Sequence, residues 1–411
     1  MSAPDRREFF ARAAGGAAAL ALVPELFAGP PRAPEPLALA LVGAGRQGRA
    51  ILGELATLDA ARVAAVCDTD ESRLASGLRR VQGARGYASH TELLEKEKEL
   101  AGVVVATPTH LHRQVCLDAL AAGKAVFCEA PLAAGPEDAR AIAKAARESG
   151  KLFQCGYQAR SNPVYALARS FVRSGTLQEL ALLRAQTHKK TSWRTPSSSP
   201  EREAELNWHL DPGISTGLMG ELGSHQLDVV HWFLGRYPLG ARGGGAIRLY
   251  DDGRKMPDTA WCDLDFGEGL HLSWSATLAS SFEGRYELLL GSMATIKLAW
   301  TAGWMFKEAD APTQGWEVYA NRQQFHNDEG ITLIADATKL AAQGKLKEGV
   351  GLPHTPLYYA LEDFVRSIAE AKPPACSADE GLRTTLVALA AQRAIATGAE
   401  VAIDPSQLQQ D

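Results

Sequence analysis

A glutamate and a histidine four residues apart form the chemical pair around which a function can be built. Glu221 and His225 lie in a stretch, 219–232, whose apolar residues recur at helical spacing, and residues at i and i+4 share one face of a helix. An imidazole with an ordinary pKa of about 6.5 can take and return a proton near neutral pH. The pair predicts acid–base chemistry on a small molecule, with Glu221 orienting the imidazole or binding a hydroxyl. A pair that only caps and packs a helix is the alternative.

A glycine pattern near the N-terminus predicts a dinucleotide site. Between an apolar run at 37–42 and a helical stretch lies a G-x-G-x-x-G motif made of Gly43, Gly45 and Gly48, with Arg46 and Gln47 before the last glycine. The first glycine permits a tight turn, the second lets backbone approach a pyrophosphate, and the third lets the helix pack on the strand. The N–H groups at the start of the helix can then bind the phosphates.

An acid at the end of the next apolar run refines the choice of cofactor. Residues 63–67 predict a second buried strand, and Asp68 follows it, twenty residues beyond Gly48. A carboxylate there accepts hydrogen bonds from the adenine ribose hydroxyls and repels a 2′-phosphate, so NAD is favoured over NADP. Arg73 leaves NADP open, because a nearby arginine can accommodate that phosphate.

Strands and helices alternate across the first part of the chain. Helical patterns at 111–122 and 136–148 separate short apolar runs, which predicts a doubly wound parallel sheet, an α/β Rossmann domain over 35–156. Loops at the carboxyl ends of two strands should face the cofactor crevice. The predicted cofactor-binding residues in these loops are Thr107, Pro108, His110, Glu129 and Ala130.

The pattern changes after Gly156. Runs of alternating hydrophobicity at 259–266, 270–278, 286–290 and 295–299 are separated by turns that contain glycine. They predict an open antiparallel sheet in an α+β domain over 157–356. Residues 357–411 are expected to form two helices that pack on the body.

The first 34 residues indicate an export signal with a proline-rich lead-in. Arg6-Arg7 precedes Phe9-Phe10 and an uncharged run from Ala13 to Val23. That run is shorter than the about 20 residues that span a bilayer, and the arrangement is typical of a twin-arginine signal. An amphipathic first helix is the alternative. The signal predicts a periplasmic or otherwise extracytoplasmic protein, exported folded by the twin-arginine machinery with any cofactor held tightly.

The composition of the chain limits the kinds of partner that it is expected to bind. The 411 residues carry 43 Lys and Arg against 48 Asp and Glu, a net charge of −5, so no basic surplus predicts nucleic acid or an anionic membrane as a partner. Six scattered cysteines form no C-x-x-C pair and no short Cys/His cluster. This excludes a disulfide-dense scaffold and a zinc site readable from sequence, and no metal is expected.

In their order, these motifs resemble the glucose–fructose oxidoreductase/inositol dehydrogenase (Gfo/Idh/MocA) family. The resemblance rests on the glycine motif, the loop that begins Thr107-Pro108-Thr109-His110, the turn Glu129-Ala130-Pro131 and the Glu221–His225 helix. It implies a sugar or polyol bound between a Rossmann domain and an open sheet, and a homo-oligomer formed through that sheet. It also implies hydride transfer between NAD(P) and a secondary alcohol, with His225 as the acid–base residue.

One position departs from the family. Ala130 stands where the family has a lysine that assists proton removal, and Glu221 stands where an aspartate is usual. Lys189 or Lys190 could supply the missing ammonium. Two other functions stay open: net glycoside cleavage by oxidation, elimination and reduction with a cofactor regenerated in place, and a non-catalytic paralogue that binds cofactor.

Seven further residues are predicted to contact the substrate. Three follow the last Rossmann strand, where the family places groups that touch substrate or nicotinamide, and four lie on segments expected to border the cleft. They are Tyr157, Gln158, Arg160, Trp193, Arg194, His209 and Asp211.

Overall fold

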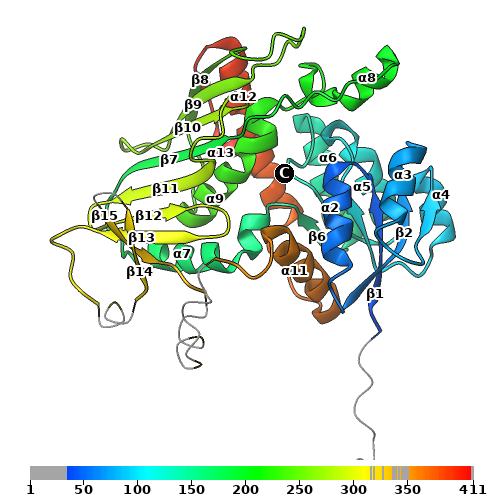
Figure 1. The fold of residues 1–411 in the computed structure, drawn as a ribbon, viewed down its shortest axis with the longest axis horizontal. Coiled ribbons are helices and arrows are strands. Elements are labelled where there is room, and N and C mark those ends of the chain that lie inside the picture. Colours follow the sequence, from blue (N-terminus) through cyan, green and yellow to red (C-terminus); the bar gives the residue numbers. More distant parts are fainter. Residues whose placement is uncertain are drawn as a thin grey trace, which may run out of the picture. The chain divides into compact units, whose positions relative to one another are not determined.

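Two sheets with separate cores organise the chain in the computed structural model (Figure 1). The predicted export signal at 1–34 lies outside the described residues. The structure describes residues 35–314, 317, 320–325, 328–335, 340, 343 and 351–408.

The first sheet is the predicted Rossmann sheet. Its six strands run parallel in the order β3-β2-β1-β4-β5-β6, so the strand order reverses beside β1, which pairs with both β2 and β4. In such sheets a ligand binds at the carboxyl ends of the strands near that reversal. The strands are β1 (Leu37–Val42), β2 (Ala61–Cys67), β3 (Arg85–Tyr87), β4 (Gly102–Val105), β5 (Ala125–Cys128) and β6 (Phe153–Cys155).

Helices cover both faces of this sheet, which explains why its central strands are apolar throughout. The helices around the sheet are α2 (Arg46–Leu55), α3 (Glu71–Leu78), α4 (His90–Lys96), α5 (His112–Ala121), α6 (Pro136–Ser149) and α11 (Pro356–Glu370). Leu39 and Leu41 belong to the core between the sheet and helices that include α2 and α11, whereas Ala40 and Val42 belong to the core on the other face, which includes α5 and α6.

The second sheet has ten strands in the order β14-β15-β13-β12-β11-β7-β10-β9-β8-β16. The prediction of an antiparallel sheet is wrong for one pair, because β7 and β10 run parallel. The chain leaves β7 through a long connection and two further strands before it returns, so no hairpin forces the opposite direction. The strands are β7 (Leu180–His188), β8 (Gly240–Ala246), β9 (Thr259–Asp265), β10 (His271–Thr277), β11 (Arg285–Gly291), β12 (Ala294–Leu298), β13 (Gly303–Lys307), β14 (Arg322–Phe325), β15 (Asp328–Thr332) and β16 (Val401–Ala402).

One face of the second sheet is covered by helices and the other is exposed. Residues of β9 alternate between buried and exposed along the strand, and Trp261 on the outer face is 47% exposed. Helix α12 links the two cores, since Leu382 packs in the Rossmann core and Val387 in the core of the second sheet. The helices of this part are α7 (Pro163–Arg173), α8 (Pro200–Leu206), α9 (Ser224–Leu234), α12 (Ala378–Thr397) and α13 (Pro405–Leu408).

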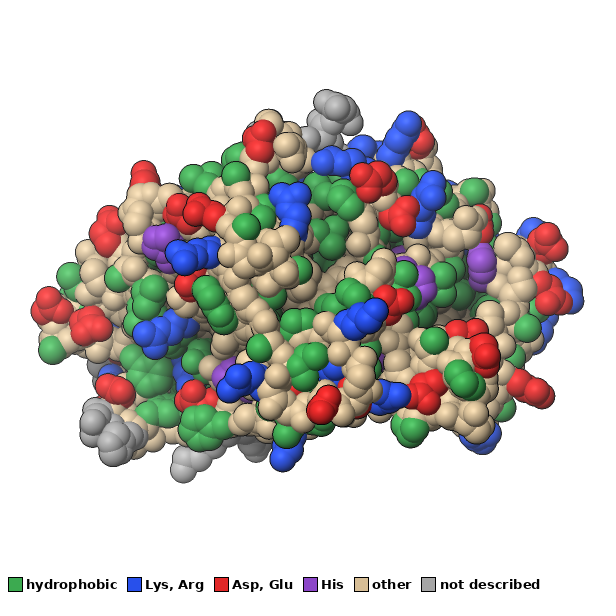
Figure 2. All heavy atoms as spheres, turned by 90° about the horizontal axis from the view of Figure 1, so that it is seen from above, with side chains coloured by type: hydrophobic (Ala, Val, Ile, Leu, Met, Phe, Trp, Pro, Cys, Tyr) green, Lys and Arg blue, Asp and Glu red, His purple; other side chains and the backbone are tan. Residues whose placement is uncertain are grey.

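From the sequence, no unusual pattern is expected in the surface charge, the cysteines or possible membrane or metal sites. Acidic and basic side chains are interspersed over the face shown in Figure 2. All six cysteines are buried and free. Within the described ranges, no helix is long and apolar enough to cross a membrane, and no cluster of His, Cys, Asp and Glu could hold a metal ion.

Candidate active site

The glycine motif forms a cradle between β1 and α2. Gly43 has a φ of +99°, and a Cβ there would lie 2.5 Å from the carbonyl oxygen of Ala106. A Cβ on Gly48 would lie 1.8 Å from the oxygen of Gly43, so the turn closes only with glycine at both positions. A Cβ on Gly45 would meet no atom within 4 Å, which leaves open space directly before the helix.

The residues around the cradle fit a dinucleotide. Helix α2 begins after Gly45 with no side chain capping its N–H groups, and such a helix start binds phosphate. Asp68 follows β2 and accepts hydrogen bonds from the N–H groups of Ala44 (2.7 Å) and Asp70 (2.8 Å). This arrangement ties the predicted ribose-binding acid to the glycine turn. Arg46 and Gln47 are exposed at the start of the helix.

Glu129 lies beside the start of α2. It directly follows β5, is buried, and accepts a 2.9 Å hydrogen bond from Gln47 Nε2. Burial raises its pKa to about 7, although the bond from Gln47 opposes that rise. Ala130 comes next and brings no titratable group to the position of the family lysine.

Glu221 connects the two sheets. It lies in a π-helical turn, Met219–Gly223, that leads into α9, and π-helical turns are frequent at functional sites. Its Oε1 accepts hydrogen bonds from Thr216 Oγ1 (2.5 Å) and from Thr109 Oγ1 of the Rossmann domain (3.3 Å). Burial raises the pKa of Glu221 to about 7, and the two threonines limit that rise.

His225 faces the end of the Rossmann sheet. Its ring contacts the ring of Tyr157 edge-on, with centroids 5.5 Å apart, and Nδ1 is buried without a hydrogen-bond partner among the described residues. Burial, reinforced by the positive charge of Arg285, lowers the pKa of His225 to about 3. The imidazole is therefore uncharged at neutral pH. This corrects the sequence-based expectation of an ordinary value, because the sequence gives no measure of burial.

Two polar atoms in the loop after β4 point to a ligand at this crevice. Thr107 Oγ1 and His110 Nδ1 are both buried, and neither has a hydrogen-bond partner in the described part of the chain. Buried polar atoms are nearly always paired in folded proteins. Together with the cradle, these atoms are compatible with a bound nicotinamide dinucleotide.

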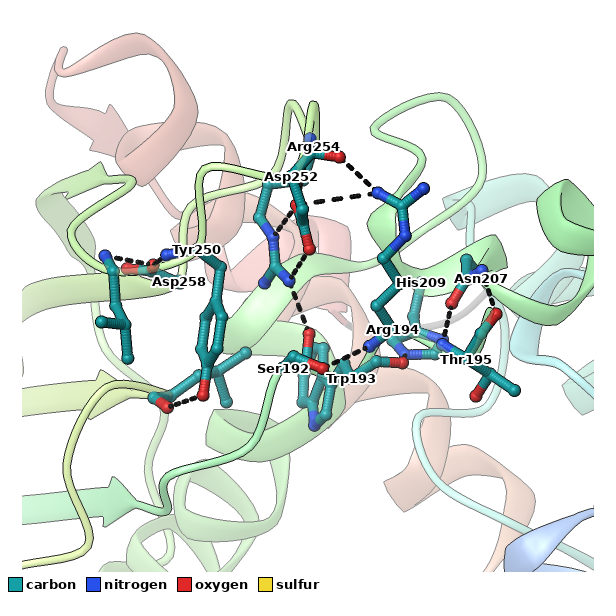
Figure 3. Close-up of polar contacts among 12 residues, drawn as sticks. Ser192, Trp193, Arg194, Thr195, Asn207, His209, Tyr250, Asp252, Arg254 and Asp258 are labelled. Atoms are coloured by element: carbon teal, nitrogen blue, oxygen red, sulfur yellow. Dashed lines mark hydrogen bonds and ion pairs between the residues drawn. The ribbon is translucent and has the colours of Figure 1, made fainter. Parts of the chain in front are cut away.

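Residues 189–216, here called the strap, leave β7 and return to α9. Figure 3 shows how its first part is fastened. Arg254, whose side chain is fully buried, donates to the carbonyl of Ser192 at 2.7 Å. His209 lies 3.0 Å from the oxygen of Trp193, and two hydrogen bonds join Asn207 to Thr195. These contacts fasten the strap, whose residues 189–197 form no helix or strand, to the segment that carries Arg254 (Figure 3).

The strap also contacts the Rossmann domain beside the cradle. Arg202 of α8 forms an ion pair with Asp70, two residues beyond Asp68. Trp208 packs against His110, with ring centroids 5.7 Å apart. The nearby charge of Arg46, after the larger effect of burial, helps to lower the pKa of His209. The strap therefore lies close to both ends of the predicted cofactor crevice.

Arg160 has a structural role instead of the predicted substrate contact. Its Nε and Nη2 bind Asp228, and its Nη1 pairs with Glu380 of α12. The side chain is 2% exposed, so this network fixes α9 and α12 to the turn after β6. Tyr157 is buried against His225, and Gln158 is buried beside it.

The other predicted residues are spread over the strap and its flanks. Lys189 and Lys190 are exposed, and no hydrogen bond or ion pair in the described part of the chain joins either ammonium to Glu221 or His225. The structure therefore gives neither lysine the place of the absent family lysine. Arg194 pairs with Glu203 within the strap.

Trp193 and His209 pack edge-on against each other, with centroids 5.1 Å apart. Asp211 accepts a hydrogen bond from the N–H of Gly213, and its charge opposes the fall that burial causes in the pKa of His110. These three residues lie on the strap, and no contact described here joins them to Glu221.

The sequence analysis did not identify Arg285, whose positive charge helps to lower the pKa of His225. The available signal was the spacing of Arg285 and Glu287, two charged residues at alternate positions of a strand that is otherwise apolar on that face. Alternate residues share a face of a strand. Charge on the covered face of a sheet often marks a functional group.

Solved structures share the fold. Levoglucosan dehydrogenase in complex with NADH and levoglucosan matches with a TM-score of 0.71 and 18% identity, over 89% of this chain and 99% of that one. Aldose-aldose oxidoreductase from Caulobacter crescentus, complexed with glycerol, matches with a TM-score of 0.70 and 18% identity, over 90% of this chain and 100% of that one.

Curated proteins are similar in sequence. Inositol 2-dehydrogenase 2 of Saccharopolyspora erythraea is 30% identical over 200 residues, 48% of this chain and 54% of that protein. Levoglucosan dehydrogenase of Pseudarthrobacter phenanthrenivorans is 26% identical over 165 residues, 40% of each protein. Inositol 2-dehydrogenase of Rhizobium meliloti is 22% identical over 376 residues, 88% of this chain and 98% of that protein. The chain spans about half the length of the first two of these relatives.

Two family descriptions match the chain in order. An oxidoreductase family with an NAD-binding Rossmann fold matches residues 37–157, and the C-terminal alpha/beta domain of the same family matches residues 172–403. The cradle and Asp68 lie in the first match, and the Glu221–His225 pair lies in the second. The chain therefore belongs to the Gfo/Idh/MocA oxidoreductase family.

Proposed function

We propose that this protein is an NAD-dependent dehydrogenase that acts on a secondary alcohol of a sugar, a polyol or a derivative. The observation that carries the proposal is the contact between the Rossmann loop after β4 and the second domain, where Thr109 binds Glu221 beside the glycine cradle. Relatives named as inositol and levoglucosan dehydrogenases support the same substrate class. Asp68 supports NAD over NADP, since a carboxylate repels a 2′-phosphate.

Within this function, Glu221 is the group that exchanges a proton with the substrate hydroxyl. When bound, NAD supplies the hydride acceptor or donor. A pKa of about 7 lets Glu221 take a proton during alcohol oxidation and return it during ketone reduction. His225 stays uncharged and binds the same hydroxyl, with Tyr157 holding its ring in place. These roles reverse the ones expected from ordinary pKa values, because burial moves the two groups in opposite directions.

Replacing His225 by glutamine is expected to lower kcat about 10- to 100-fold, the effect of one hydrogen bond to a group that becomes charged. The pH at which the rate is half-maximal should stay where it is in the parent protein, because Glu221 sets it. The pH dependence of kcat checks this outcome. A pH midpoint that disappears with His225 would instead make the histidine the titrating group.

The dehydrogenase activity itself is tested by mixing the purified protein and NAD+ with a panel of sugars, polyols and sugar acids. Appearance of NADH absorbance with at least one member is the expected result. The matched control is the Glu221→Gln variant, which should bind NAD+ as the parent does. If no member yields NADH and no ketose is reduced by supplied NADH, the redox function is wrong.

A cofactor that is retained between turnovers fits the strap and the N-terminal sequence. The strap pairs with Asp70 beside the ribose-binding acid and packs on His110 after β4. Export in the folded state, which the twin-arginine pattern at Arg6-Arg7 predicts, would place the protein where free NAD is scarce. We therefore infer a periplasmic or otherwise extracytoplasmic protein, exported by the twin-arginine machinery with NAD already bound.

Arg202→Ala is expected to speed NAD dissociation about two- to fivefold, because a partly exposed ion pair contributes up to about 1 kcal/mol. Stopped-flow displacement of NADH fluorescence measures the rate. Arg202 also pairs with Glu205, so Glu205→Gln is the matched control and should leave the rate unchanged. Equal rates in the parent and in Arg202→Ala would show that the ion pair does not hold the strap over the cofactor.

Net glycoside cleavage is the second candidate, and Ala130 favours it. Without an amine beside the hydroxyl, the site departs from the family arrangement for simple alcohol oxidation. Release of free sugar from a glycoside by protein that receives no added NAD would support cleavage. Accumulation of a keto sugar and NADH in equal amounts would support oxidation instead.

The open face of the second sheet supports assembly into a homo-oligomer. Its exposed residues include Trp261, which is 47% exposed, and large exposed apolar side chains mark interaction surfaces when they cluster. Trp261→Glu is the simplest probe of this face, read out as the molar mass in light scattering.

A further inference from the structure

The fold uses only part of the hydrogen-bonding capacity of the Arg285 guanidinium. Arg285 begins β11 opposite Thr187 of β7, and its side chain is 21% exposed. Glu287, two residues along the strand, is fully buried and accepts a hydrogen bond from Gln226 of α9. Alternate residues of a strand share a face, so Arg285 belongs to the face that α9 covers.

Two nitrogens of this guanidinium lack hydrogen bonds. Nε and Nη2 are buried, and neither has a hydrogen-bond partner in the part of the chain that the structure describes. The nearest acid is Glu287, with Oε1 3.5 Å from Nε. Its oxygens already accept from Tyr165 Oη and Gln226 Nε2. Since buried donors are usually paired, the unpaired edge indicates a missing acceptor.

A second arginine of this protein shows what such an edge binds. Arg160 donates from Nε to one oxygen of Asp228 at 2.9 Å and from Nη2 to the other at 2.8 Å. Arg285 presents the same edge, with its Nε in a 3.5 Å ion pair with Glu287 and its Nη2 without a hydrogen-bond partner among the described residues. Its Cζ lies 3.8 Å from the centroid of the Trp300 ring, and this stacking fixes the plane of the guanidinium.

Arg285 lies close to the part of α9 that carries His225, because its strand partner Thr187 donates a hydrogen bond to Gln226, the residue after His225. Its charge lowers the pKa of His225, second only to burial, and no carboxylate contributes an opposite effect there. Glu221 lies four residues before His225, and because its pKa is raised to about 7 it is partly protonated at neutral pH. The ion pair with Glu287 balances part of the charge of Arg285, so an anionic group gains mainly from the N–H donors of this guanidinium that have no hydrogen-bond partner among the described residues.

We propose that Arg285 binds a carboxylate of the substrate, which makes the substrate a sugar acid such as a hexuronate. This inference rests on the proposed dehydrogenase function and narrows its substrate class. A carboxylate is planar and accepts two parallel hydrogen bonds from one guanidinium edge. The hydroxyls of a neutral sugar can also accept from a guanidinium, but they carry no charge and the bonds are weaker. Arg285 then orients the sugar so that one of its secondary hydroxyls meets His225 and Glu221.

Calorimetric titration of the full chain, saturated with NAD, tests the proposal with matched pairs of hexuronates and neutral hexoses. We expect at least one hexuronate to bind about tenfold or more tightly than its hexose, as for a hydrogen-bonded charge pair. Arg285→Gln should remove that preference. Arg285→Lys keeps the charge without the two-bond edge and should retain part of it. Arg184→Gln, on the exposed face of the same sheet, is the matched control and should bind as the parent does.

Equal affinity for acid and neutral sugars, binding of neither class, or a preference that survives in Arg285→Gln overturns the proposal. Circular dichroism of each variant establishes that it is folded. The NAD titration that precedes each experiment separates two failures. A protein that binds NAD and shows no preference for acids refutes the role of Arg285 alone, whereas a protein that binds no NAD refutes the proposed function as well.

Discussion

Replacing Glu221 by glutamine should lower kcat about 10²- to 10⁴-fold, the contribution of a positioned acid–base group. Glutamine keeps the size of the side chain and can still accept from Thr216 and Thr109, which bind Oε1 in the parent protein. It cannot take up a proton. The loss should therefore fall on the chemical step, while NAD binding and the fold remain as they are in the parent.

The parent protein should show opposite pH dependences for the two directions of the reaction. Glu221 must be ionised to accept a proton, so the rate of alcohol oxidation should rise with pH through about 7 and then level off. Ketone reduction needs the protonated acid, so its rate should fall with pH over the same range. His225, with a pKa of about 3, is already neutral there and contributes no midpoint.

Glu129 provides the control, since burial raises its pKa to about 7 as well. Glu129→Gln should retain a midpoint near the same pH, whatever happens to the size of the rate. Glu221→Gln should lose the midpoint together with the rate. A Glu221→Gln variant that keeps both would remove this residue from the chemistry.

Gly45→Ala is expected to weaken NAD binding about 10- to 100-fold while the chain folds normally. A Cβ at Gly45 meets no protein atom within 4 Å, so the methyl group causes no clash in the protein itself. The second glycine of this motif is the point of closest approach of the pyrophosphate. Overpacking of that contact by one carbon costs about 1–3 kcal/mol.

Gly53 offers a matched substitution in the same helix. A Cβ there also meets no atom within 4 Å, and Gly53 lies two turns beyond the helix start. Gly53→Ala should bind NAD as the parent does, as measured by fluorescence titration of NADH. Equal affinities for Gly45→Ala and the parent would show that the pyrophosphate does not lie over the cradle.

The Rossmann domain could be predicted from the sequence because its signals are local. Each central strand is a short apolar run and each helix follows after a turn, so alternation alone predicts a parallel sheet with both faces covered. The six-stranded order confirms that fold class. Strand β3, only three residues long, was missed because so short a run has no readable period.

The second sheet was harder to predict because its features depend on long-range packing. Strand β8 has the sequence GARGGGA, and glycine is depleted in strands. A Cβ at Gly243 would lie 2.6 Å from the carbonyl oxygen of Trp261, so close approach to β9 explains a glycine that local propensity disfavours. The parallel pairing of β7 with β10 likewise depends on the path of the strap.

Some residues of the candidate site could be predicted from the sequence, and others could not. The glycine cradle and Asp68 were predicted, because each is a residue type at a fixed spacing from a strand end. The opposite pKa shifts of Glu221 and His225 come from burial that only the fold creates. Arg160 and Arg285 each have a carboxylate neighbour, Asp228 and Glu287, and their sequence positions do not reveal which guanidinium keeps N–H groups without hydrogen bonds.

Acid extraction of the full chain, purified from a host with twin-arginine export and without added cofactor, tests the central proposal most directly. The proposed function predicts NAD(H) at one equivalent per chain after gel filtration, held by the cradle and the strap. Protein that emerges empty and still binds no NAD or NADH when either is supplied would contradict it. If the protein emerges empty but then binds supplied NAD, the proposed dehydrogenase function stands. The proposal that the cofactor stays bound between turnovers is then refuted.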